Sequence, residues 1–513
     1  MSTAQPRPVD GVTPGQHLWK RATRNQHGTH QRPQVSDPRQ FHACIATADP
    51  DDAVGCQCST PWELKPVPGR SSFAEVPQQR YASTGTCAQA RAQRRGQTYE
   101  TAEGRDKGVT GLSFESMWAA LEPVGRSTST GGYHRFAWTR EDHDLREWFA
   151  AECARRGLDL TEDRMGNQWA WWGDPDSAAA RGTSGVVTGS HLDSVPDGGA
   201  FDGPLGVVSA LAALDDLRDR GFVPARPIGV VNFVDEEGAR FGVACAGSRV
   251  ITGALSADRA RSLTDADGTT MAEALATAGR DPALVGPDPE ALARIGAFVE
   301  LHVEQGRGLV DLDHPVALGT DIWPHGRWRL DFPGEANHAG TTRLEDRRDA
   351  MLGYAHAVLT ARHAAETHGC VATIGKVAVR PGGVNAIPSA VTGWLDARGP
   401  DEASVRAAVS TVEAEAQRAG ATVTEESWTP TTAFDQHLGA RIHTRLGGIP
   451  MLGTGAGHDA GILANAGIPT AMLFVRNPTG VSHSPKEWAE ADDCLAGVRA
   501  LASVLEELAG ETP

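Results

Sequence analysis

Hydrophobic residues occur along much of the chain in short continuous runs, with amphipathic stretches between them. Uninterrupted runs predict strands buried on both faces, and apolar residues at 3.6-residue spacing predict helices with one buried face. The predicted strands are 185–189, 228–234, 297–301 and 469–475, and the predicted helices are 112–121, 141–156, 205–219 and 490–509. This alternation indicates an α/β fold, in which helices flank a mainly parallel sheet.

Residues 320–430 interrupt this rhythm. The predicted elements there are strand 327–333, helix 346–366, strands 371–379 and 389–397, helix 401–419 and strand 421–428. The β-α-β-β-α-β order is that of a ferredoxin-like α+β domain. We therefore predict an inserted domain at 320–430, which splits the α/β core into 111–319 and 431–513.

Residues 1–110 differ from the rest of the chain in composition. They are rich in Gln, Arg, Pro, Thr and Ser and show no sustained apolar period. They carry 14 Lys and Arg against 10 Asp and Glu, whereas the whole chain has a net charge of −17. Such a segment is predicted to be disordered or loosely packed. Alternatively, the native protein begins near Val109.

The net charge and the cysteine pattern limit which partners and which cellular compartment are expected. A net charge of −17 over 513 residues argues against nucleic acid or an anionic membrane as a partner. No apolar run approaches the roughly 20 residues that span a bilayer, and no signal peptide is evident. The eight cysteines are scattered, with only Cys56 and Cys58 close together. Free thiols and a cytoplasmic location are expected.

A first group of chemically useful side chains follows the predicted strand 185–189. His191 comes at the strand end, where its imidazole is free to bind a metal ion. Asp193 is placed to accept the other ring N–H of His191, which would orient the ligand. Asp202 lies in a glycine-rich turn that can fold back toward His191, and its two oxygens could bridge two cations.

Three further motifs follow other predicted strands. Glu236 and Glu237 lie after strand 228–234, His302 after an apolar strand, and His483 after strand 469–475. Adjacent glutamates suit a division of labour between a metal ligand and a general base that carries a proton. Each motif alone has an ordinary structural explanation, such as a solvated helix start or a hydrogen-bonded histidine. Together, imidazoles and carboxylates at strand ends indicate a site for Zn²⁺, Mn²⁺ or Co²⁺ rather than Ca²⁺.

With these motifs in this order, residues 112–510 resemble the M20-type metallohydrolases, and more narrowly the N-carbamoyl-L-amino-acid hydrolase and allantoate amidohydrolase branch. The resemblance implies two divalent metal ions per subunit and a di-metal exopeptidase-like core. It places His191, Asp202 and His302 at one ion, with Asp202, Glu237 and His483 at the other. Glu236 would be the general base. The wider family's peptidases usually carry a carboxylate in place of His302, so this imidazole favours the ureido branch.

The resemblance also extends to the inserted domain, which in this family is a lid and dimerisation domain. A homodimer through 320–430 is therefore expected. His338 matches a histidine that stabilises the oxyanion in the partner's active site. The residues that match substrate contacts are Gln305, Arg327, Asn385 and Arg398. Arg398 could instead pair with Asp396 or Asp401, and Asn385 could be a turn residue.

Two stretches depart from the family pattern, which affects the choice of substrate rather than the metal chemistry. Residues 323–327 replace a Gly- and Gln-rich stretch, and Thr342-Arg-Leu replaces Thr-Pro-Met. No role is assigned to His458 in the glycine-rich loop 453–459. The expected reaction converts an N-carbamoyl-L-amino acid to the amino acid, CO₂ and ammonia. Allantoate and 3-ureidopropionate are alternative substrates, and a dipeptidase, an aminoacylase or a dimeric binding protein without turnover are further alternatives.

Overall fold

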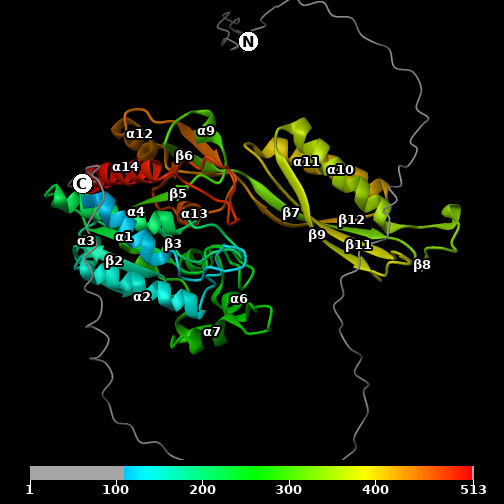
Figure 1. Cartoon of the computed structure of the whole chain (residues 1–513), viewed down its shortest axis with the longest axis horizontal. Coiled ribbons are helices and arrows are strands. Elements are labelled where there is room, and N and C mark those ends of the chain that lie inside the picture. Colours follow the sequence, from blue (N-terminus) through cyan, green and yellow to red (C-terminus); the bar gives the residue numbers. More distant parts are fainter. Residues whose placement is uncertain (1–108, 511–513) are drawn as a thin grey trace, which may run out of the picture. The chain divides into compact units, whose positions relative to one another are not determined.

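The computed structural model describes residues 109–510, and the prediction for the preceding segment lies outside them (Figure 1). Within this range a nine-stranded sheet has the order β1-β2-β4-β3-β5-β15-β6-β13, with β14 beside β6. Its strands are β1 Asp159–Glu162, β2 Gln168–Trp172, β3 Gly185–His191, β4 Ile228–Phe233, β5 Ile295–Val303, β6 Val316–Ile322, β13 Thr432–Ala433, β14 Met451–Thr454 and β15 Thr470–Val475.

The centre of this sheet is parallel. Strand β3 pairs in parallel with β4 and β5, and β5 pairs in parallel with β15. Outer pairings such as β2 with β4 and β6 with β15 are antiparallel. The predicted α/β fold with a mainly parallel sheet is therefore confirmed, although the strand predicted at 297–301 extends over Ile295–Val303.

Helices cover both faces of this sheet. Helix α4 (Pro204–Asp219) contacts α1 (Val109–Leu121) and α14 (Ala491–Gly510), whereas α13 (Asp459–Asn465) contacts α5 (Ala246–Thr252) and β15. The further helices are α2 Arg140–Arg155, α3 Pro175–Ala180, α6 Ala257–Ser262, α7 Met271–Thr277, α8 Pro289–Ala293, α9 Gly308–Asp311 and α12 Gln436–Arg445, with 3₁₀ turns at Pro282–Leu284 and Leu344–Asp346. Most of α4 is buried, and each buried Leu or Val side chain there contributes about 1.5–3 kcal/mol to folding.

A second, antiparallel sheet has the order β12-β7-β11-β9. Its strands are β7 His325–Pro333, β9 Val371–Arg380, β11 Ala390–Arg398 and β12 Thr422–Thr429, and its helices are α10 Ala350–His368 and α11 Glu402–Arg418. The chain order of these elements is ferredoxin-like, and both helices lie on one face of the sheet (Figure 1). Helix α10 begins later than the 346 predicted, because the Asp349 side chain caps it by accepting the N–H of Met351.

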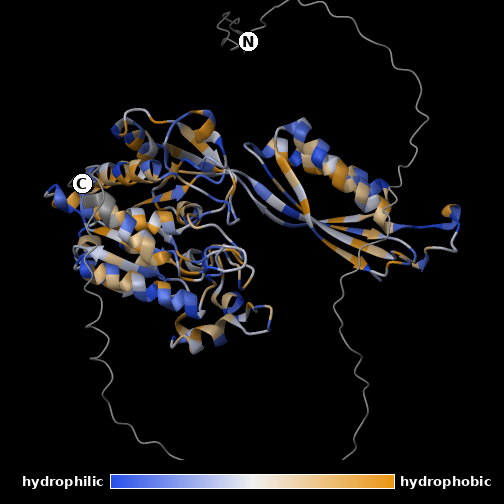
Figure 2. Cartoon of the chain, in the orientation of Figure 1, coloured by the Kyte–Doolittle hydropathy of each residue, from blue (hydrophilic) through white to orange (hydrophobic). Residues whose placement is uncertain are grey.

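Alternating residues of β7 explain the packing of this second unit. Trp328, Leu330 and Phe332 are buried together with alanines of α10 and α11, while the residues between them are less buried. Figure 2 accordingly shows hydrophobic and hydrophilic residues mixed along both helices. A short ladder of β8 (Asn337–His338) and β10 (Ala386–Ile387) belongs to neither large sheet.

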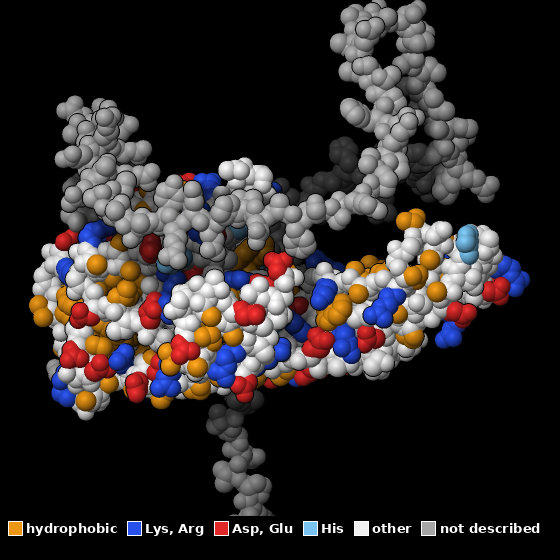
Figure 3. All heavy atoms as spheres, turned by 90° about the horizontal axis from the view of Figure 1, so that it is seen from below, with side chains coloured by type: hydrophobic (Ala, Val, Ile, Leu, Met, Phe, Trp, Pro, Cys, Tyr) orange, Lys and Arg blue, Asp and Glu red, His pale blue; other side chains and the backbone are white. Residues whose placement is uncertain are grey.

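On the face shown in Figure 3, acidic and basic side chains are interspersed, so neither sign of charge forms a large block there. Among the helices between residues 109 and 510, none combines the length and apolar content that crossing a membrane requires. The cysteines in this range are free thiols, as predicted, and the others lie outside the described residues.

Candidate metal centre

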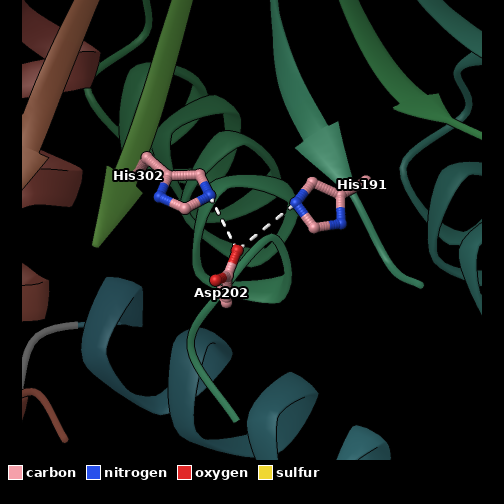
Figure 4. Close-up of side chains that lie close together, drawn as sticks. All are labelled: His191, Asp202 and His302. Carbon is pink, nitrogen blue, oxygen red and sulfur yellow. Dashed lines mark ion pairs between the residues drawn. The ribbon is translucent and has the colours of Figure 1, made fainter. Parts of the chain in front are cut away.

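Two histidines and one aspartate meet at the carboxyl ends of neighbouring strands. His191 ends β3, and His302 lies near the end of β5, with which β3 pairs in parallel. Asp202 precedes α4 and points toward both rings (Figure 4). Its Oδ1 lies 3.6 Å from Nε2 of His191 and 3.2 Å from Nε2 of His302.

The second ring nitrogen of each histidine faces a backbone carbonyl. Nδ1 of His191 is 3.2 Å from the carbonyl oxygen of Asp193, and Nδ1 of His302 is 2.9 Å from that of Val303. A ring N–H that donates to a carbonyl leaves Nε2 with a free lone pair. Both Nε2 atoms are buried and have no hydrogen-bond partner among the described residues. This arrangement fits a divalent cation between the two rings and Asp202.

The other oxygen of Asp202 faces a second group of ligand atoms. Oδ2 lies 3.5 Å from Nε2 of His483, and that nitrogen lies 3.6 Å from Oε2 of Glu237. Asp202, Glu237 and His483 could hold a metal ion, as could His191, Asp202 and His302. Because Asp202 contributes a separate oxygen to each set, its carboxylate could bridge two cations.

Asp193 fixes the backbone on which the two glutamates stand. Its carboxylate oxygens accept the N–H groups of Glu236 at 3.1 Å and Glu237 at 3.0 Å. The same carboxylate lies 3.4 Å from Nδ1 of His191. One buried side chain therefore orients a predicted ligand from β3 and the loop that follows β4.

Glu236 is held differently from Glu237. Its Oε1 accepts a hydrogen bond from the Cys245 thiol at 3.2 Å, and its Oε2 lies 3.7 Å from Nε2 of His191. Burial raises the pKa of Glu236 well above its ordinary value, and the carboxylates of Asp459 and Glu237 add to the rise. A carboxyl group with a raised pKa is suited to accept a proton and pass it on.

The protonation of the cluster shows how much negative charge is collected there. Burial and the neighbouring Asp202 raise the pKa of Glu237 to about 8. Burial alone would also raise the pKa of Asp202, but His191 and His302 outweigh it and bring that pKa well below its usual range. The buried carboxylates thus outnumber the positive charges that the chain places beside them. A divalent cation would stabilise their ionised forms.

Two of the predicted substrate contacts lie beside this cluster. Gln305 donates to Oδ2 of Asp202 at 2.8 Å, and it lines a cavity of about 590 Å³ together with His483 and Arg398. The alternative of an Arg398–Asp396 ion pair is present in the structure, at 2.6 Å. Exposed Arg327 lies 3.4 Å from the same Asp396.

Two other predicted residues, the oxyanion donor and the remaining substrate contact, lie elsewhere. His338 and Asn385 are both exposed, at the short β8–β10 ladder where Ala386 pairs with His338. Neither residue lines the cavity beside His483. Within one chain, the structure therefore does not bring these two side chains to the metal cluster.

Two buried residues at the cluster were missed by the sequence analysis. Glu487 accepts the backbone N–H groups of Phe201 at 2.8 Å and Asp202 at 2.9 Å, so it fixes the backbone that carries the Asp202 carboxylate, across 285 positions of sequence. The ring of His458 stands edge-on to His302, with 4.6 Å between ring centres. The only sequence signals were an acid shortly after His483 and a histidine in a glycine-rich loop.

Residues 187–507 match the model of peptidase family M20/M25/M40. The chain belongs to this family. It is 36% identical over 416 residues to an N-carbamoyl-L-amino acid amidohydrolase of Geobacillus stearothermophilus, with 78% of this chain and 99% of that protein covered. An allantoate amidohydrolase of Escherichia coli is 31% identical over 394 residues, covering 74% and 93% of the two chains.

A solved structure gives the same result. The crystal structure of an amidase of the hydantoinase/carbamoylase family from Burkholderia multivorans matches with a TM-score of 0.69 and 30% identity, covering 79% of this chain and 98% of that one. The predicted resemblance is confirmed, as is the enzyme class, an amidohydrolase acting on C–N bonds other than peptide bonds. The family is metal-dependent, and the described residues of the chain include clusters of side chains that could hold a metal ion.

Proposed function

We propose that this chain hydrolyses an N-carbamoyl-L-amino acid to the amino acid, CO₂ and ammonia. The observation that carries the proposal is the Asp202 carboxylate, whose two oxygens face separate sets of buried ligand atoms. This carboxylate and the ligand atoms around it would hold two divalent cations. Zn²⁺ and Mn²⁺ are the main candidates, and Co²⁺ is a further one. His191, Asp202 and His302 would bind one, and Asp202, Glu237 and His483 the other. When bound, the cations supply positive charge that polarises the substrate carbonyl and acidifies water.

The remaining steps belong to side chains of the protein. Glu236 takes a proton from the attacking water and returns it to the nitrogen that leaves as the C–N bond breaks. Cys245 and the Glu236 backbone contacts hold that carboxylate in place while it works. Gln305, fixed between Asp202 and Ser482, orients the ureido group. Arg327, Arg398 and Asn385 are proposed to contact the rest of the substrate.

We further propose that residues 320–430 form the lid and the homodimer contact, on a core made of 111–319 and 431–513. His338 would then come from a second copy of the chain and donate to the oxyanion. His338 and Asn385 are exposed and do not line the cavity of the chain that carries them, which supports this assignment. A preformed donor supplied by a partner would complete each site only in the assembled dimer.

The choice of N-carbamoyl-L-amino acids over allantoate rests on the relatives. The Geobacillus protein named for that substrate is more similar to this chain than the Escherichia coli allantoate enzyme, at 36% against 31% identity. Allantoate remains the second candidate, because it is also a ureido acid and its named enzyme covers most of the chain. A 3-ureidopropionate substrate is a third.

The test is ammonia release by purified protein that has been stripped of metal and refilled with Mn²⁺, Zn²⁺ or Co²⁺. The panel contains N-carbamoyl-L-amino acids, allantoate, 3-ureidopropionate and dipeptides, with amine release measured for the last. We expect metal-dependent turnover of N-carbamoyl-L-amino acids, and a loss of at least about 100-fold in kcat for Glu236→Gln at unchanged metal content. Turnover of allantoate alone would make allantoate the substrate in place of N-carbamoyl-L-amino acids. Full activity of Glu236→Gln would show that Glu236 is not the general base.

A further inference from the structure

The cavity beside the metal centre contains an arginine that no prediction from the sequence included. Arg307 lines this space of about 590 Å³ together with Gln305, His483, Trp323 and Arg398. It follows Gln305 by two residues, and the amide of Gln305 donates to the bridging Asp202. Arg307 and Gln305 thus line one cavity, and Gln305 contacts the predicted metal ligand Asp202.

The guanidinium of Arg307 is available, whereas that of Arg398 is already occupied. Nε and Nη2 of Arg398 both donate to Oδ1 of Asp396, at 2.9 and 2.6 Å, and Nη1 donates to the carbonyl of Gly455 at 2.8 Å. Between residues 114 and 510, no carboxylate lies within ion-pair distance of Arg307, and its side chain is exposed. An unpaired guanidinium in a cavity presents its planar fork of donors to a ligand carboxylate.

The acid nearest in sequence does not neutralise this arginine. Glu304 is buried, and its two oxygens accept the N–H groups of Gly308 at 2.5 Å and Leu309 at 3.0 Å. Its charge is therefore directed at the N-terminal turn of the α9 segment. The positive charge of Arg307 remains uncompensated in the cavity.

The stem of Arg307 is fixed by a glycine in the loop that carries His483. A Cβ atom at Gly480 would lie 2.1 Å from Cγ of Arg307 and 2.7 Å from its Cδ. Gly480 also has a φ of +63°, which glycine adopts at low cost. The arginine stem consequently packs directly on the loop, three residues before His483.

We propose that Arg307 binds the carboxylate of the substrate while the ureido group lies at the metal centre. This inference rests on the proposed function and deepens it. The substrate class becomes ureido compounds with a carboxylate close to the scissile C–N bond, as distinct from neutral ureas and amides. Arg307 thus adds a second guanidinium to the cavity, beside Arg398, whose donors already contact Asp396 and the carbonyl of Gly455.

The test pairs a variant with a change in the substrate. For Arg307→Gln, KM for the best N-carbamoyl-L-amino acid should rise about 10- to 100-fold, because a charge-assisted pair of hydrogen bonds is lost. The corresponding N-carbamoyl amino acid amide has no carboxylate, and the wild type and Arg307→Gln should turn it over equally. Arg307→Lys should lie between the two, and Arg259→Gln, which changes an exposed arginine of α6 outside 320–430, serves as the matched control.

Two results would overturn the assignment. The first is an equal loss on the acid and on its amide in Arg307→Gln, which would indicate a structural role. The second is a carboxylate-specific loss in Arg398→Gln but not in Arg307→Gln. Failure of the proposed function gives a different result, namely no turnover of N-carbamoyl-L-amino acids by the wild type. If allantoate is turned over instead, the same comparison with allantoate and its carboxamide decides the role of Arg307.

Discussion

At the scale of single residues, Asp202 has the greatest effect on the proposed chemistry, because both of its oxygens face ligand atoms. Asp202→Asn replaces one oxygen with an NH₂ group that cannot bind a cation. We expect the wild type to retain two metal ions per chain after gel filtration, and Asp202→Asn to retain fewer than one, as measured by elemental mass spectrometry. Asp267→Asn, in an exposed turn, should behave as the wild type.

The same pair of proteins can be compared by thermal unfolding. Metal bound only by the folded state raises the melting temperature, so chelation should lower it in the wild type and in Asp267→Asn. In Asp202→Asn, chelation should change the melting temperature little. A wild type whose unfolding is indifferent to chelation and refilling would contradict the two-ion centre, whatever its activity.

At the scale of elements, Trp323, which follows β6, packs closely against Gly453 in β14. A Cβ atom at Gly453 would lie 2.4 Å from the indole Nε1 of Trp323, and the backbone N–H of Trp323 donates to the carbonyl of Thr454 at 2.8 Å. Gly453→Ala should cost about 1–3 kcal/mol in the free energy of unfolding, since the indole must move. It should also raise KM, because Trp323 lines the cavity.

Denaturant unfolding and steady-state kinetics check this prediction. Gly457→Ala is the matched control, because a Cβ atom there meets nothing within 4 Å. Equal stability of the two variants would show that the indole relaxes freely and does not form a fixed wall of the cavity.

The elements also show what the sequence could and could not predict. Strands β3, β4 and β15 are buried along their whole length, so their apolar runs identified them. Strand β1 is polar and mostly exposed, and β6 includes Gly, Thr and Asp, so neither gives a continuous run. Their pairing depends on neighbours that are distant in the chain.

The site follows the same division. His191 and His302 could be found because they directly follow or end apolar strands, where α/β sheets place their ligands. Glu487 could not, since its role depends on a contact with Asp202 that only the fold creates. Arg307 carries no local signal either, because its availability depends on which carboxylates the fold pairs with other groups.

At the scale of the whole molecule, the proposed active site is divided between two copies of the chain. Glu236 lies in the buried cluster after β4, whereas His338 is exposed on the β8–β10 ladder. Glu236→Gln and His338→Ala should each abolish most activity alone. Mixing the two variants under conditions of subunit exchange should restore about a quarter of wild-type activity, because half of the dimers are mixed and each has one intact site.

This recovery separates a shared site from two alternatives. If His338 acted within its own chain, every mixed dimer would contain two damaged sites and no activity would return. If His338 had no catalytic role, His338→Ala alone would remain active, and mixing would only dilute it. Exchange itself is established by mixing tagged and untagged wild-type subunits and recovering the hybrid on the tag, so an inactive mixture with proven exchange would exclude the dimeric site. A mixture of Glu236→Gln with the double variant Glu236→Gln/His338→Ala contains no intact Glu236 and should remain inactive, which shows that any recovery requires the Glu236 supplied by the His338→Ala copy.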